Sequence, residues 1–206
     1  MSPARTFPAV AFACLALATA SPARAAFIAT ITEVGADVVL SGSGTINLAG
    51  LSKVLGGHSV RPGALGPNAG ILLMGAPGAE SIDAAYTGFT APAAFGTTSG
   101  PFFPTSGSGT KFGFGPDSGP IRFELDEGLS NVLISSTSTF AGQTLDSLGL
   151  TLGTYVWSWG AGPTADTFTL NITDTPPSSS TPEPASLALL AAGLAGLTLQ
   201  RRRKQA

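Results

Sequence analysis

The fold is decided by the stretch GTYVWSW at residues 153–159, together with the stretch TFTLNIT at residues 167–173. Successive side chains of a β-strand point to opposite faces, so each stretch presents one apolar and one more polar set. The segment 160–166 between them is rich in turn-forming residues. The pattern predicts an antiparallel hairpin whose apolar sets pair across the strands. These sets are Tyr155, Trp157 and Trp159 on the first strand and Phe168, Leu170 and Ile172 on the second.

The aromatic set of this hairpin has two interpretations. Alternating aromatic rings on one strand face can form part of a hydrophobic core, or they can form a platform on which sugar rings stack. The candidate glycan platform is Tyr155, Trp157 and Trp159. The chain has few other large apolar side chains with which to build a core, so we favour the core interpretation.

Residues 26–174 have the length of one ordinary domain. They are rich in Gly, Ser, Thr and Pro and poor in the residues that long amphipathic helices need. Short alternating runs bounded by Gly or Pro predict an all-β fold, a single β-sandwich of jelly-roll or immunoglobulin-like type. Besides the closing hairpin, we expect strands at 27–34, 37–41, 45–48, 71–74, 82–89, 111–114, 121–125 and 132–139.

The remaining segments of this domain read as loops and turns. We expect loops at 53–70 and 90–109, where Gly, Pro, Ser and Thr dominate, and a turn or bulge at Ser41–Gly44. In the run 121–126, alternation predicts that Phe123 and its apolar neighbours face the core. Arg122, Glu124 and Asp126 would then face solvent.

No constellation of catalytic residues emerges from the sequence, and we predict a protein that is not an enzyme. His58 is the sole histidine and stands in a glycine-rich loop without a nucleophile motif. Glu124 and Asp126 could lie within the range of an inverting glycosidase pair, but i, i+2 carboxylates on a solvent face are commonplace. We expect no metal site and no cofactor, with calcium near acids such as Asp117 as the weak alternative.

Charge is unevenly distributed along the chain. Residues 26–183 contain four basic residues, against all twelve acidic ones, which gives this region a formal charge of −8. A region of that sign is repelled by phosphate backbones, so we expect no nucleic-acid partner.

The N-terminus has the features of a signal peptide spanning residues 1–25. Arg5 precedes the short apolar stretch 9–20, and Ala23-Arg24-Ala25 provides small residues around a cleavage site. We therefore predict cleavage by signal peptidase between Ala25 and Ala26. The mature chain would contain no cysteine, because Cys14 is the only one.

The C-terminus changes character after Asp174. Residues 175–181 form a Pro/Ser linker, and residues 182–206 carry Pro182-Glu183-Pro184, the uncharged run 185–199 and a cluster of basic residues. As a helix this run would span roughly 22 Å, less than a hydrocarbon core of about 30 Å. We expect a short membrane helix whose basic end stays in the cytoplasm.

This arrangement resembles the PEP-CTERM sorting signal of Gram-negative bacteria. The resemblance rests on three elements in order at the C-terminus: the tripeptide Pro182, Glu183 and Pro184, a Leu/Ala/Gly helix, and an Arg-rich end. It implies that an exosortase recognises the tripeptide and removes the helix. It also implies residence at the outer surface or in an extracellular matrix, after an inner-membrane intermediate, in a bacterium that produces exopolysaccharide.

Two function classes follow from these features. The first is an exported, non-catalytic surface or matrix protein with a structural or adhesive role. The alternative is a carbohydrate-binding module associated with exopolysaccharide. Exposure of Trp157 and Trp159 to solvent distinguishes the two classes, because only exposed rings could stack on a sugar.

Overall fold

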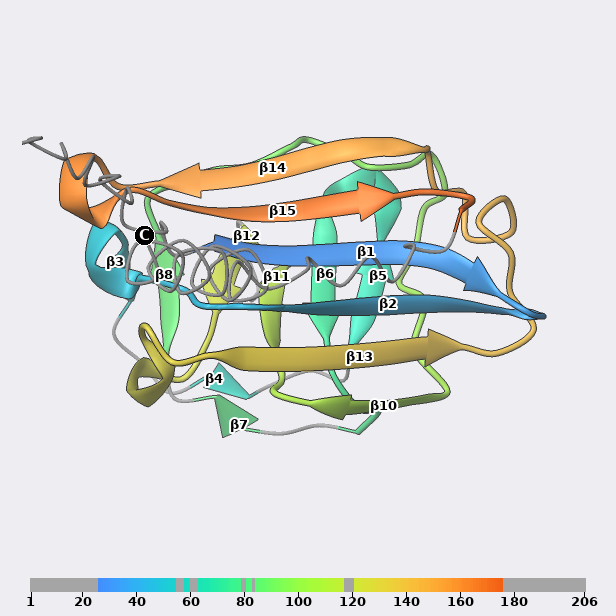
Figure 1. Cartoon of the computed structure of the whole chain (residues 1–206), viewed down its shortest axis with the longest axis horizontal. Helices are drawn as coiled ribbons and strands as arrows, with labels where there is room; N and C mark the ends of the chain where they lie inside the picture. Colours follow the sequence, from blue (N-terminus) through green and yellow to red (C-terminus); the bar gives the residue numbers. More distant parts are fainter. Residues whose placement is uncertain are drawn as a thin grey trace, which may run out of the picture. The chain divides into compact units, whose positions relative to one another are not determined.

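The computed structural model describes residues 26–54, 58–59, 63–78, 81–82, 84–116 and 121–175 (Figure 1). The chain divides into two units, residues 1–174 and residues 175–206. The described residues of the first unit form mostly β-strands, and the two main sheets pack as a sandwich, as the sequence predicted.

One layer of the sandwich is a seven-stranded sheet. Its neighbours pair antiparallel with one exception, because β1 and β15 run parallel. The first and last strands of the domain are therefore adjacent in the sheet. The order across the sheet is β10 (Ser106–Gly109), β13 (Ile134–Phe140), β2 (Asp37–Gly44), β1 (Ala26–Val34), β15 (Asp166–Ile172), β14 (Gly153–Trp159) and β9 (Phe89–Thr90).

The second layer is a six-stranded antiparallel sheet. Its strands cross behind those of the first layer in Figure 1. The order is β3 (Ser52–Val54), β8 (Ala85–Thr87), β12 (Ile121–Glu124), β11 (Phe112–Pro116), β6 (Ile71–Met74) and β5 (Ala64–Gly66). The short strands β4 (His58–Ser59) and β7 (Ser81–Ile82) pair separately, and the 3₁₀ turns are η1 (Leu48–Gly50), η2 (Pro67–Ala69), η3 (Glu127–Leu129) and η4 (Gly162–Thr164).

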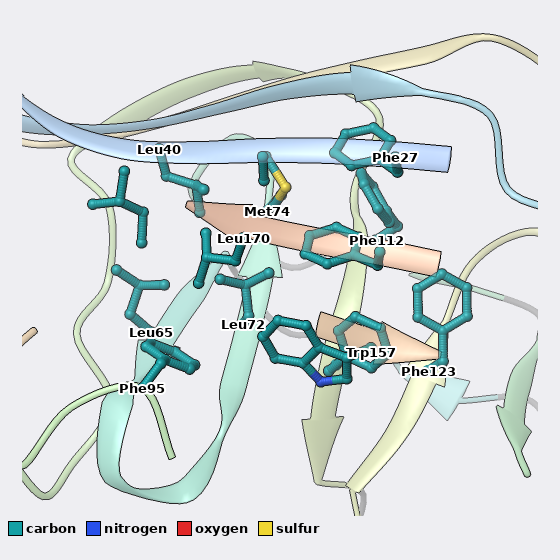
Figure 2. Packing of buried hydrophobic residues seen from close by; sticks show 14 of the residues in the cluster. Phe27, Leu40, Leu65, Leu72, Met74, Phe95, Phe112, Phe123, Trp157 and Leu170 are labelled. Atoms are coloured by element: carbon teal, nitrogen blue, oxygen red, sulfur yellow. The ribbon is translucent and has the colours of Figure 1, made fainter. Parts of the chain in front are cut away.

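The core lies between the two sheets and is dominated by aromatic rings (Figure 2). Phe27 from β1 meets Phe112 from β11 edge to face, with ring centroids 4.8 Å apart. Trp157 from β14 stacks on Phe114 from β11 at 4.9 Å. Offset stacks and edge-to-face contacts are the arrangements that aromatic quadrupoles favour, so these contacts join the two layers.

The predicted closing hairpin forms, and two of its pairs join the two apolar sets. Tyr155 pairs with Leu170 and Trp157 with Phe168 across β14 and β15. Trp159 lies opposite Asp166, and Gly153 lies opposite Ile172. Local alternation therefore identified both strands and the face that enters the core.

The structure corrects the prediction of a turn at Ser41–Gly44. These residues continue β2, which pairs with β1 on one side and β13 on the other. A Cβ at Gly42 would lie 2.6 Å from Cε1 of Phe27. Glycine is needed there because the Phe27 ring lies against the backbone of β2, not because the chain turns.

Other predicted elements were misplaced. The expected strand at 45–48 is an irregular segment that leads into η1, and the expected loop at 53–70 contains β4 and β5. The loop at 90–109 ends in β10, an edge strand made only of Ser and Gly. Composition missed these elements because strand pairing, rather than side-chain propensity, holds them in place.

Candidate functional site

The candidate glycan platform lies inside the protein. Trp157 is 0% exposed and Trp159 is 4% exposed. The half-buried Tyr155 packs against the same core, and its hydroxyl donates to the carbonyl of Thr151. Two of the three rings are closed to solvent, so the core interpretation of this strand face holds and the platform interpretation is wrong.

The carboxylates considered for glycosidase chemistry do not form a pair. Glu124 is 1% exposed, which corrects the prediction that it faces solvent with Arg122 and Asp126. Alternation correctly separated it from Phe123, but its side chain is buried rather than exposed. Asp126 instead caps η3 by accepting the backbone N–H of Gly128.

Glu127, the neighbour of Asp126 in the sequence, and His58 both have partners in the structure. Glu127 makes an ion pair with Lys53, and His58 pairs through its backbone with Ile82. Asp117 lies outside the described residues. Among those that are described, no group of three or more His, Cys, Asp or Glu side chains could hold a metal ion.

A buried carboxyl group that the sequence did not single out lies at the first residue of β15. Asp166 is 3% exposed. One of its oxygens accepts the backbone N–H of Asn47, and the other accepts the N–H of Thr167, each at 2.6 Å. The carbonyl of Asn47 in turn accepts the indole N–H of Trp159 at 2.8 Å. Asp166 and Trp159 thus fix the segment before η1 to the end of the closing hairpin.

A polar hollow of about 430 Å³ opens beside this carboxyl group. Burial raises the pKa of Asp166, and the hydrogen bonds from the backbone of Asn47 and Thr167 oppose that rise. Among the described residues that line the hollow, Asp166 is the only carboxylic acid. Acid–base catalysis of glycoside hydrolysis uses two carboxyl groups, so the geometry favours a structural role for this one.

The raised pKa of Asp166 predicts a stability that increases on acidification. Between the usual pKa of aspartate and the raised folded value, the native state binds more protons than the unfolded chain. We expect the free energy of unfolding of the wild type, relative to Asp166→Asn, to increase as the pH falls from neutrality towards the usual aspartate pKa. Urea denaturation of both proteins across this range measures the difference, in which the other carboxyl groups cancel. A difference that stays constant or moves the other way contradicts the assignment.

The outward face of the seven-stranded sheet is a regular polar surface. Ser and Thr occupy most of its positions, because these residues alternate with the core-facing set on β1, β2, β13, β14 and β15. The hairpin already signals this face through Thr154, Ser158 and Thr167. How far this polar face extends across the sheet is visible only from the register of the other strands.

The predicted processing sites flank the described domain. Ala26, the expected first residue of the mature chain, is the first residue of β1. Ala25, the signal peptide, the linker residues 176–181 and the tripeptide Pro182, Glu183 and Pro184 lie outside the described residues, as does the predicted membrane helix. Within the part of the chain that is described, no helix is long and apolar enough to cross a membrane.

Comparison with known proteins identifies one segment of the chain. The model of the PEP-CTERM protein-sorting motif matches residues 180–204, which confirms the sorting signal predicted from the tripeptide, the apolar run and the basic end. No curated protein and no solved structure matches the chain.

Proposed function

We propose that this exported, exosortase-sorted chain is a non-catalytic surface or matrix protein, whose β-sandwich is the part delivered outside the cell. The PEP-CTERM motif at residues 180–204 carries the proposal, because it marks a protein sorted through the membrane and processed by an exosortase. The tripeptide Pro182, Glu183 and Pro184 is then a recognition site for another enzyme. Signal peptidase removes residues 1–25 in the same proposal.

The fold supports a structural or adhesive role. Most aromatic rings of the described domain pack in the core between the two sheets. The carboxyl groups of Asp126, Glu127 and Asp166 are used in a cap, an ion pair and a backbone clamp. Such a domain offers a stable surface rather than a reactive centre. Its final location is the outer surface or the extracellular matrix.

Processing of the tail can be tested directly. We expect the protein to lose the mass of its C-terminal segment when it is coexpressed with an exosortase from a bacterium that makes PEP-CTERM proteins. Replacing Pro182, Glu183 and Pro184 together with alanine should abolish nearly all of this loss, because the protease then has no tripeptide to recognise. Intact-mass spectrometry of the purified protein measures the outcome.

The matched control for this experiment lies in the neighbouring linker. Replacing Ser178 and Ser179 with alanine changes the same region without touching the tripeptide, and cleavage should continue at the wild-type level. A wild-type mass that the exosortase leaves unchanged refutes the sorting assignment.

The second candidate, carbohydrate binding, is favoured by the outward face of the seven-stranded sheet rather than by the aromatic face. That surface is rich in hydroxyl groups, which donate and accept hydrogen bonds as sugar hydroxyls do.

A further inference from the structure

The register of the seven-stranded sheet aligns one row of polar side chains across six neighbouring strands. Each member of this row is directly opposite the next in the strand pairing. The strands that carry it, β10, β13, β2, β1, β15 and β14, lie side by side in Figure 1. In that order the row, hereafter the polar row, consists of Ser108, Thr137, Ser41, Thr30, Asn171 and Thr154.

The polar row lies on the face of the sheet that is turned away from the core. Its neighbours along each strand are the core residues, such as Ala29 and Ile31 on either side of Thr30. Ser108 and Thr154 are exposed, and the four members between them are half-buried. The hydroxyls of Ser108 and Thr137 lie 2.9 Å apart, and Thr154 donates to the side-chain carbonyl of Asn171 at 2.9 Å.

Charge is nearly absent from this surface. Among the outward positions of the seven described strands, Asp37 at the start of β2 is the only ionisable side chain. Glu33 and Asp166 occupy core-facing positions, where they accept backbone N–H groups of Leu145 and of Asn47 and Thr167. Apart from Asp37, the acidic residues of these strands are therefore directed away from this face, which suits an uncharged partner.

The spacing of the polar row matches an extended polysaccharide. Neighbouring strands lie about 4.8 Å apart, so the row offers one polar group at each such interval and spans roughly 24 Å. This interval is comparable with the length of one sugar ring along an extended β-1,4-linked chain. Such a chain, lying across the strands, would meet one polar side chain per sugar residue over about five or six residues.

The row beside it supplies apolar contact. Ile28 is 54% exposed, and Val156 is 45% exposed. Both lie on the same outward face, separated across the sheet by Thr169. Aliphatic side chains next to a line of hydroxyls match the alternating C–H and O–H groups of a sugar ring.

We propose that the polar row binds a neutral, extended β-1,4-linked polysaccharide that lies across the strands of the seven-stranded sheet. This inference rests on the proposed role of the domain at the cell surface or in the matrix, and it names the class of partner. A second copy of the chain fits the face less well, because the centres of protein interfaces are enriched in apolar and aromatic side chains rather than in small hydroxyls.

Binding should depend on the length of the sugar chain. The probes are cello-oligosaccharides of two to six glucose units, titrated by calorimetry into the full-length protein in a detergent without a sugar head group. We expect cellohexaose to bind at least about tenfold more tightly than cellobiose, because more members of the row are engaged. An anionic oligogalacturonate of equal length should bind more weakly, because the domain is acidic.

Substitution tests whether the polar row is the site. Thr30→Val combined with Thr137→Val keeps the shape and the strand propensity of both residues and removes two central hydroxyls. We expect affinity for cellohexaose to fall about tenfold or more. The matched control is Thr87→Val, another half-buried strand threonine, on β8 of the other sheet, which should change the affinity by less than about twofold.

The inference is overturned if cellobiose and cellohexaose bind with equal affinity, or if neither binds. It is also overturned if the double variant binds cellohexaose as tightly as the wild type. A dimer in light scattering that the double variant dissociates overturns it as well, because a second copy would then cover the polar row. If the exosortase cleaves the protein but no glycan binds, only this inference is refuted. If a glycan binds but the exosortase does not cleave, only the sorting assignment is refuted.

Discussion

Replacing Trp157 with alanine is expected to destabilise the domain by about 3–5 kcal/mol, a large share of the 5–15 kcal/mol that usually separates folded and unfolded domains. The ring is fully buried and stacks on Phe114, and it meets Phe168 edge to face at 5.4 Å. Its removal leaves a cavity between the two sheets at the point where β14 contacts β11. Urea denaturation followed by tryptophan or far-UV signals measures the loss.

Two further substitutions define the cause of this effect. Trp157→Phe keeps an aromatic ring in the stack and removes an indole N–H that has no hydrogen-bond partner among the described residues. We therefore expect a cost well below that of alanine. Val156→Ala, next to it on the exposed face, should cost less than about 1 kcal/mol. Equal losses at positions 156 and 157 would mean that the aromatic stack does not join the layers.

A single methyl group at Gly113 is expected to destabilise the domain by at least about 3 kcal/mol. Gly113 has φ +147°, and a Cβ there would lie 2.0 Å from the carbonyl oxygen of Leu72. The strand β11 is bonded to β6 on one side and to β12 on the other, so it cannot move away from Leu72 without disrupting its other pairing. Gly113→Ala should therefore lower the denaturation midpoint steeply or abolish cooperative unfolding.

The control for this prediction separates backbone strain from the clash. Gly100 has φ +109°, but a Cβ there meets nothing within 4 Å. Gly100→Ala consequently tests the cost of a positive φ alone, which we expect to be about 1 kcal/mol. If both alanine variants lose the same stability, the close approach of β11 to β6 is not what requires glycine at position 113.

The parts of the fold that the sequence predicted depend on local information. The hairpin of β14 and β15 was recognisable because its two alternating strands are separated by one short turn-rich segment, so the apolar sets identify the face that enters the core. The strand at Ile71–Met74 was recognisable as a short apolar run bounded by glycines. In both cases neighbouring residues contained the whole signal.

The parts that the sequence missed depend on distant partners. Ser41–Gly44 was misassigned because Gly42 leaves room for the Phe27 ring, and Gly44 for the backbone of Ala26, on another strand. Glu124 was placed in solvent because alternation shows which side chains share a face with the core residues, but not whether the opposite face is covered. From the sequence alone Asp166 was interpreted as part of the turn-rich segment 160–166, because only the fold shows that Asn47 lies against it.

The outward polar face of the seven-stranded sheet was also predictable only where local information specifies it. Thr154, Ser158 and Thr167 were visible as the polar side of the hairpin. The polar row, in contrast, joins residues 41 and 154 through three pairings, and no local pattern specifies these pairings. Only the tail motif, which acts as a short linear signal, could be identified completely without the fold.

The parallel pairing of β1 with β15 determines how the domain would carry a mechanical load. Ala26 lies beside Thr167 and Ile31 beside Ile172, so the chain enters at one end of this strand pair and leaves at the other. Opposing forces on the two ends would shear the strands along their length and strain their hydrogen bonds together, whereas unzipping would break them one at a time. If the protein is held by its C-terminal end while the matrix or fluid pulls on the rest, the hydrogen bonds between β1 and β15 would resist the tension together.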